Sequence, residues 1–174
     1  MGNPTRFYLQ PSSPAISHDG GNAYWNINAL STPAPDFDFG AWEFVKDVDG
    51  YLNFYFDLPK VINNTTPNAK IILRLLANAT TGVSSFDVET RPRAEGETLD
   101  VALDSTMAIQ DVPMPTTAFV EKEVTFTLPT SGNDHPVQSL DTLLCMIKHN
   151  GTKGEDTIAV NTLMKPPQLE VDLT

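Results

Sequence analysis

The sequence has 174 residues, of which 40% are hydrophobic, and its 22 acidic and 11 basic side chains give a net charge of −11. This length and apolar content fit one domain with its own core, which argues against disorder of the whole chain. Because phosphate contacts need clustered Lys and Arg, the acidic charge argues against nucleic acid and anionic membrane as partners.

Residues 1–40 are rich in Pro, Gly, Ser and Asn and are predicted to form an N-terminal arm. Prolines interrupt β-ladders and helices, yet the segment carries Phe7, Tyr8 and Trp25, which a flexible linker would not need. We expect an extended arm with two short strands, near 5–9 and 22–28, docked on its own domain or on a neighbour. The N-terminus lacks the apolar region of a signal peptide, so we expect a product that is made in the cytosol and not exported by a standard route.

Residues 41–174 are predicted to form a two-sheet antiparallel β-sandwich. Apolar and polar residues alternate at 51–58, 120–128 and 169–173, as in strands with one buried and one wet face. Segments 71–76 and 143–147 are apolar on both faces. They therefore read as central strands, or as strands covered by an arm or a subunit.

Weaker strands are expected at 41–45, 83–90, 98–103, 105–110 and 156–163. A short helix at 97–109 stays open as an alternative, because Leu99, Leu103 and Met107 also follow helical spacing. Turn signals separate the strands. Asp49-Gly50 predicts a hairpin between 42–45 and 52–58, and Thr81-Gly82 divides 69–77 from 83–90.

No catalytic or metal-binding motif is found in the sequence, and no cofactor is expected. The histidines His18, His135 and His149 are far apart and match no zinc spacing, and no GxSxG marks a nucleophile. The acidic clusters do not satisfy an EF-hand, and turn chemistry is favoured over a calcium ion in the loops. The single cysteine, Cys145, lies in an apolar run and is interpreted as a buried hydrophobic residue.

Aromatic residues offer a choice between two functions. Tyr51 and Tyr55 lie on the polar face of their strand, and with Trp42 they are candidates for stacking on sugar rings, as in carbohydrate-binding modules. The favoured alternative is that both tyrosines are covered by the arm or by a partner subunit, because the arm carries aromatics of its own and must dock somewhere.

Several segments resemble a group of small tailed-phage virion proteins described as minor structural, head-decoration or jelly-roll proteins. They are Thr5-Arg6-Phe7-Tyr8-Leu9, Trp42-Glu43-Phe44, Tyr55-Phe56-Asp57-Leu58-Pro59, the central hairpin formed by 69–77 and 83–88, Gly96-Glu97-Thr98-Leu99-Asp100, Asp141-Thr142-Leu143, and Gly154-Glu155-Asp156-Thr157 leading into the last hairpin. The resemblance implies a jelly-roll domain, trimeric and displayed on a capsid or tail, with no catalytic residues.

From this resemblance we expect a non-enzymatic protein of the virion surface, made in the host cytoplasm, that decorates or cements a phage capsid. Its partner would be the major capsid protein or another virion protein, and the arm would contact it. The docking candidates are Arg6, Phe7, Tyr8, Leu9 and Trp25. The alternative function is a carbohydrate-binding β-sandwich, for example a host-attachment tip of a tail or head fibre.

Overall fold

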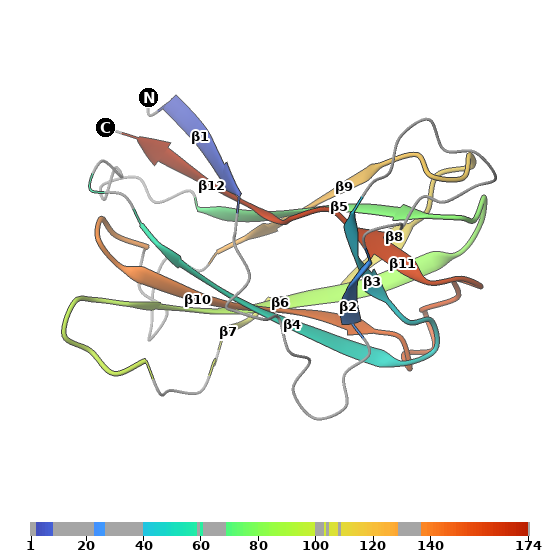
Figure 1. Ribbon diagram of the computed structural model, residues 1–174, viewed down its shortest axis with the longest axis horizontal. Coiled ribbons are helices and arrows are strands. Elements are labelled where there is room, and N and C mark those ends of the chain that lie inside the picture. The colour runs from blue at the N-terminus through green and yellow to red at the C-terminus, as the bar shows by residue number, and fades with distance from the viewer. Residues whose placement is uncertain are drawn as a thin grey trace.

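The computed structural model describes residues 3–8, 23–26, 40–58, 60, 69–99, 103, 105–107, 109–128 and 137–173, and every regular element in these residues is a β-strand. Two antiparallel sheets face each other (Figure 1). Apolar side chains fill the space between them. The chain is therefore an all-β, two-sheet sandwich, as predicted. Within the described ranges no helix is long and apolar enough to cross a membrane. Within the range 97–109, for which a short helix was the alternative prediction, Ser105–Thr106 form a short strand.

The first sheet has seven strands and is organised around β5 (Lys70–Ala77). One side of β5 pairs with β9 (Lys122–Thr127), and the other side pairs with β11 (Thr162–Met164) and β12 (Gln168–Leu173). Beyond these, β12 pairs with β1 (Asn3–Tyr8), and β11 pairs with β3 (Ala41–Phe44), which in turn pairs with β2 (Ala23–Asn26). The central place of β5 explains why its sequence is apolar on both faces.

The second sheet has five strands and is organised around β10 (Thr142–Asn150). It pairs with β4 (Asp49–Asp57) on one side and with β6 (Val83–Arg93) on the other. The far side of β6 carries the short strands β7 (Ser105–Thr106) and β8 (Gln110–Pro113). Residues of β10 alternate between buried and half-buried, which places Leu143, Cys145 and Ile147 in the core and Leu144 and Met146 on the outer face.

From β3 to β6, and again from β8 to β11, each successive strand lies in the opposite sheet, as in a jelly roll. β3, β5 and β11 belong to the first sheet, whereas β4, β6 and β10 belong to the second. The hairpins expected at Asp49-Gly50, at Thr81-Gly82 and after 154–157 are therefore wrong, because the strands that these turns join do not pair with each other. The connection at Gly82 needs a left-handed backbone, with a φ of 106°, and passes close to the chain at 157–158.

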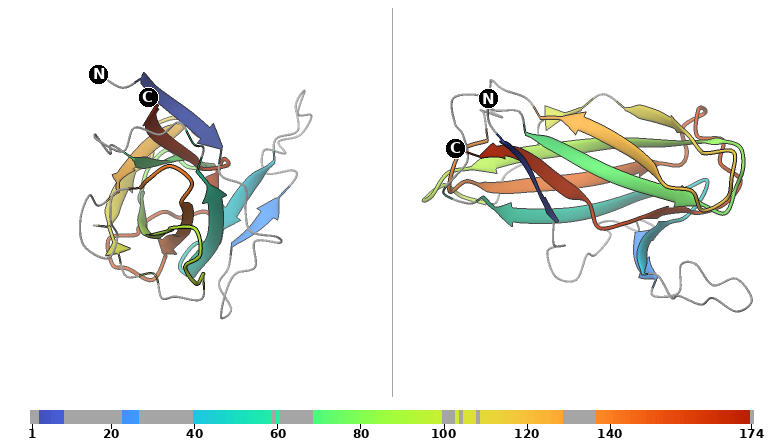
Figure 2. Two further views of the ribbon diagram at one scale, coloured as in Figure 1. Left: turned by 90° about the vertical axis from the view of Figure 1, so that its left-hand side faces the viewer. Right: turned by 90° about the horizontal axis from the view of Figure 1, so that it is seen from above.

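The two strands expected in the N-terminal arm are present as β1 and β2, and both extend the first sheet of their own chain. Figure 2 shows that they join this sheet at well separated places. The structure therefore supports the predicted positions of these two strands. The predicted division at residue 40 into an arm and a separate domain stays a prediction. Leu9 lies outside the described residues, as do the side chains of Tyr8 and Trp25.

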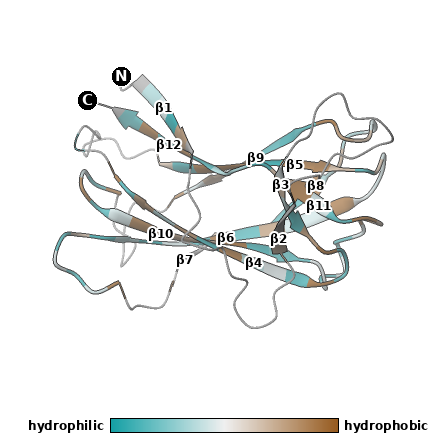
Figure 3. Ribbon diagram, in the orientation of Figure 1, coloured by the Kyte–Doolittle hydropathy of each residue, from teal (hydrophilic) through white to brown (hydrophobic). Residues whose placement is uncertain are grey.

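The core consists of residues on the inner faces of both sheets, and hydrophobic residues alternate with hydrophilic ones along the strands (Figure 3). Phe44 of the first sheet meets Phe86 of the second edge to face, with ring centroids 5.1 Å apart. A smaller cluster of Ala41, Leu76 and Leu163, partly covered by Phe119, lies apart from the main core. Lys70 and Arg74 of β5 are half-buried and point outward, so they belong to the polar outer face of the first sheet.

Candidate functional site

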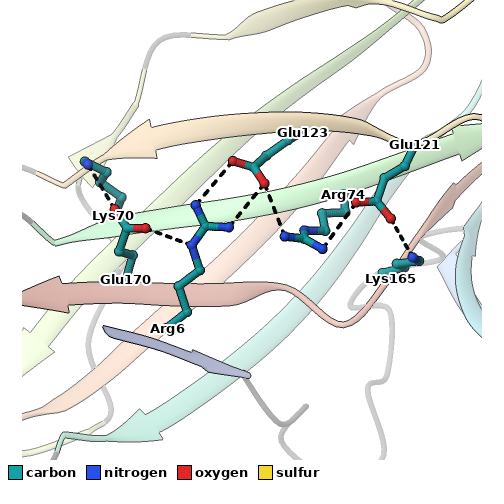
Figure 4. A network of polar contacts seen from close by, with 7 residues as sticks. All are labelled: Arg6, Lys70, Arg74, Glu121, Glu123, Lys165 and Glu170. Atoms are coloured by element: carbon teal, nitrogen blue, oxygen red, sulfur yellow. Dashed lines mark hydrogen bonds and ion pairs between the residues drawn. The ribbon is translucent and has the colours of Figure 1, made fainter. Parts of the chain in front are cut away.

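The outer face of the first sheet carries a continuous line of ion pairs (Figure 4). The line runs through Lys70, Glu170, Arg6, Glu123, Arg74, Glu121 and Lys165. Arg6 Nε donates to Glu170 Oε2 at 2.8 Å, and Lys70 Nζ donates to Glu170 Oε1 at 3.0 Å. The line thereby connects β1, β12, β5 and β9, which lie far apart in the sequence.

These contacts also tune the ionisation of the groups involved. Hydrogen bonds from the Arg6 guanidinium and then from Lys70 hold the pKa of Glu170 below its usual range. The hydrogen bonds that Arg6 donates to Glu170 and Glu123 in turn raise the pKa of Arg6. These seven side chains are all charged, pair with one another and include no aromatic ring, so this face is a poorer candidate for a sugar-binding site than a face with aromatic side chains.

The outer face of the second sheet is different, because it presents aromatic and apolar side chains beside polar ones. The strand register places Tyr55 next to Leu144, Asn53 next to Met146, and Tyr51 next to Lys148. Tyr55 is 50% exposed, whereas Tyr51 is half-buried. The two tyrosines therefore lie on the outward face of β4, as the alternation in the sequence predicted, and the structure leaves half of Tyr55 uncovered.

A cleft of about 390 Å³ opens beside Tyr55. Its floor is formed by residues of β4 and β10, and its wall by Leu99 and Leu103, which follow β6 in the chain. The lining residues are Asn53, Phe54, Tyr55, Leu99, Leu103, Leu144 and Cys145. Ligand sites in proteins are commonly concave, mostly apolar and ~300–1,000 Å³ in volume, with a few polar groups that fix orientation. The cleft has this character, with the Asn53 amide and the Tyr55 hydroxyl as its polar side-chain groups.

A polar row crosses the same face two register positions beyond the cleft. Lys148 Nζ lies 5.6 Å from the centroid of the Tyr51 ring, 3.5 Å from Glu89 Oε1 and 3.8 Å from Asp87 Oδ2. Burial raises the pKa of Asp87, and the charge of Lys148 offsets part of this effect. Burial alone would lower the pKa of Lys148, but the carboxylates of Asp87 and Glu89 outweigh it and raise this pKa. The row therefore holds hydrogen-bond donors and acceptors next to an aromatic ring.

Trp42, predicted as part of a glycan-stacking surface, is a core residue. It is only 6% exposed and meets Phe54 edge-on, with ring centroids 6.4 Å apart. β3 is buried along its whole length, because it joins the first sheet rather than forming a hairpin with β4. A buried indole offers no face for a sugar ring, so Trp42 is removed from the candidate site.

The docking candidates whose side chains the structure describes, Arg6 and Phe7, both contact their own chain. Arg6 belongs to the line of ion pairs, and Phe7 packs against Phe56 with ring centroids 5.7 Å apart. The contact with Phe56 accounts for the aromatic side chain at position 7 without a second protein. Docking on a capsid through these residues stays a prediction.

Of the residues of this site, only Tyr51 and Tyr55 were predicted from the sequence. Those that were not predicted include Leu99, Leu103, Lys148, Asp87 and Glu89. Lys148, Asp87 and Glu89 could have been selected only with the register of β6, β10 and β4 in hand. Leu99 and Leu103 were noted for their helical spacing, but a periodic pattern does not indicate which surface a loop residue covers. Leu99 is 56% exposed, so its side chain can be reached by a ligand in the cleft.

A buried histidine lies near the other end of β10. His149 is fully buried, and its Nε2 lies 3.0 Å from Asp156 Oδ2 while its Nδ1 lies 3.2 Å from the Val48 carbonyl. Asp156 Oδ2 also accepts a hydrogen bond from the Ser85 amide at 2.8 Å. With both ring nitrogens engaged and no exposed surface, His149 ties the loop after β10 to β6 and has no access to a substrate.

Within the described part of the chain, no group of three or more His, Cys, Asp or Glu side chains is arranged to hold a metal ion. No family model matches the sequence, and no curated protein matches it.

Several solved structures share the fold. The K1 cleaved adhesin domain of Lys-gingipain from Porphyromonas gingivalis W83 is 11% identical and has a TM-score of 0.54, with 98% of this chain and 99% of that chain covered. A family 11 carbohydrate-binding module from Clostridium thermocellum is 11% identical with a TM-score of 0.44, covering 95% of this chain and 96% of that one. The CBM22-1 xylan-binding domain from Paenibacillus barcinonensis Xyn10C is 12% identical with a TM-score of 0.43, covering 99% and 97%. At such identities the similarity concerns the fold alone.

Proposed function

We propose that this protein is a non-catalytic carbohydrate-binding β-sandwich, and that the glycan binds on the outer face of the second sheet. The observation that carries the proposal is the cleft of about 390 Å³ in which the half-exposed ring of Tyr55 lies beside Asn53 and Leu144. The other outer face is occupied by ion pairs that already satisfy one another.

The chemistry of the cleft suits a sugar. A pyranose has C–H groups on its ring faces and hydroxyl groups around its rim, so it needs an apolar or aromatic surface with hydrogen-bonding groups at the edge. The Tyr55 ring and the side chains of Leu99 and Leu144 supply the apolar surface. An amide such as that of Asn53 can both donate to and accept from a hydroxyl group.

The test is a glycan-array screen followed by titration calorimetry on the glycans that bind. Tyr55→Ala should weaken binding about tenfold, equivalent to about 1.4 kcal/mol, because it removes the aromatic surface. Leu140→Ala is a suitable control, since Leu140 is 55% exposed and does not line the cleft. Absence of binding to any glycan, or an unchanged affinity of Tyr55→Ala, would refute the proposal.

The capsid-decoration hypothesis remains a separate prediction with its own test. It expects trimers in solution and loss of binding to phage capsids when residues 1–30 are removed. Arg6 and Phe7 already contact their own domain, so they do not favour this hypothesis over glycan binding. The two functions are compatible if the glycan-binding face is displayed on a virion, as at a host-attachment tip.

A further inference from the structure

We infer that the binding site extends along β4 from the cleft to the row formed by Tyr51 and Lys148, and that it takes an uncharged oligosaccharide of three or more rings. This inference rests on the proposed function. It adds the length and the charge class of the ligand, and it assigns a role to Lys148.

The length follows from the geometry of β4. Tyr55 and Tyr51 are four residues apart on the same face of an antiparallel strand, so they are separated by ~14 Å at about 3.4 Å per residue. A six-membered ring built from bonds of about 1.5 Å, with its bridging oxygen, advances a sugar chain by roughly 5 Å. A single sugar therefore reaches only the cleft, whereas a chain of three rings can contact both ends of the site.

Asn53 and Met146 lie between the two ends and continue the surface. They are neighbours in the register of β4 and β10, and both are half-buried on the outer face. The surface from the Tyr55 row to the Tyr51 row is therefore a continuous strip on two adjacent strands, which suits an extended chain better than a compact branched one.

At the far end of this strip, Lys148 is the group that can contact a ligand. Its side chain is 23% exposed, whereas those of Glu89 and Asp87 are 14% and 4% exposed. The two carboxylates and the Tyr51 ring hold the ammonium group in place. An ammonium held in this way donates to a hydroxyl oxygen with little loss of conformational entropy.

The charge class follows from the ion pairs on this face. Lys148 faces two carboxylates, and Arg93 pairs with Glu97 at 3.5 Å. These two cations are thus already matched by acidic groups. A third cation, Arg91, lies next to Leu144 in the register of β6 and β10 and is also engaged in an interaction, and the chain as a whole carries a net charge of −11. A uronic acid or a sulfated sugar would be repelled by this field, whereas an uncharged sugar meets no such penalty.

The experiment uses an array of neutral glucans, galactans, xylans and mannans from one to six rings, with uronic-acid and sulfated oligosaccharides of the same lengths alongside. We expect binding to begin at three rings and to be confined to neutral chains. Lys148→Met should weaken binding of the longer chains about fivefold to tenfold. Lys46→Met is the control, because Lys46 lies in the turn before β4 and is 48% exposed.

The outcomes separate the inference from the proposed function. Equal affinity for one ring and for longer chains, preference for acidic glycans, or wild-type affinity of Lys148→Met would overturn the inference while glycan binding stands. No binding to any glycan would overturn the proposed function itself. If Lys148→Met does not fold, as judged by its thermal transition, Tyr51→Ala tests the same end of the site, and its unchanged affinity for long chains would also overturn the inference.

Discussion

Replacement of Phe7 by Ala tests whether β1 belongs to the sandwich or is held for another protein. In the structure, β1 pairs with β12 over six residue pairs, and the Phe7 ring packs on Phe56 at 5.7 Å between centroids. Phe7 is half-buried against the main core. If β1 is an integral strand, loss of this ring must lower the free energy of unfolding of the isolated protein.

The magnitude can be worked out from the burial. Replacement of a fully buried Phe by Ala costs about 3–5 kcal/mol, of which part is the cavity left behind. Because Phe7 is only half-buried, about half of the lower value plus the aromatic contact applies, which gives about 2 kcal/mol. For a domain of this size, that loss corresponds to a fall of about 4–8 °C in Tm.

The assay is urea unfolding followed by circular dichroism, with a thermal melt as a second measure. The midpoint should fall while the slope m stays the same, which shows that the native and unfolded states are otherwise unchanged. Leu140→Ala should stay within about 0.5 kcal/mol of the wild type, as is usual for surface positions. A Phe7→Ala protein as stable as this control would show that β1 does not contribute to the fold, and it would restore Phe7 as a candidate for docking on a partner.

Three further predictions concern the interior and the charged face. Gly151→Ala should lower the free energy of unfolding, measured by urea titration, by about 1–3 kcal/mol through overpacking, because a Cβ there would lie 2.4 Å from the Val48 carbonyl oxygen. Gly154→Ala is the control and should be neutral, because a Cβ there would have no heavy atom within 4 Å. Burial raises the pKa of Cys145 to about 12, so alkylation by iodoacetamide at pH 8 should be slow in buffer and fast in urea; rapid modification of the folded protein would contradict this burial. Glu170 has its pKa held below the ordinary 4.5 by Arg6, so its contribution to stability is present above about pH 4.5 and is lost as the pH falls through the lowered value. Glu170→Gln should therefore lose less stability than the wild type between pH 5 and pH 2, and parallel curves for the two proteins would refute the assignment.

The strands were predicted well where apolar and polar residues alternate. The segments 51–58, 120–128 and 169–173 correspond to β4, β9 and β12, and 71–76 and 143–147 are the central strands β5 and β10. The reason is local, because successive side chains of a strand point to opposite faces whatever strand lies beside it. Alternation therefore also predicted that Tyr51 and Tyr55 point outward.

The candidate site was predicted only in part, and Trp42 illustrates the reason. Its neighbour in sequence, β4, carries Tyr55, and a hairpin would have brought the indole close to this ring. The structure instead places Trp42 in the first sheet and Tyr55 in the second. Lys148 was not predicted as a site residue, because it lies next to Tyr51 only through the pairing of β10 with β4. A site composed of three strands depends on contacts between residues that are far apart in the chain.

Side-chain alternation and turn-forming residues were enough to predict the class of the fold, the position of most strands and the side of each strand that faces the core. Only the tertiary structure decided which sheet each strand joins, because a strand with one apolar face can be buried equally well by either sheet. That choice turned expected hairpins into crossings between the sheets, brought β1 and β12 together from opposite ends of the chain, and placed Tyr55, Leu99 and Leu144 around one cleft.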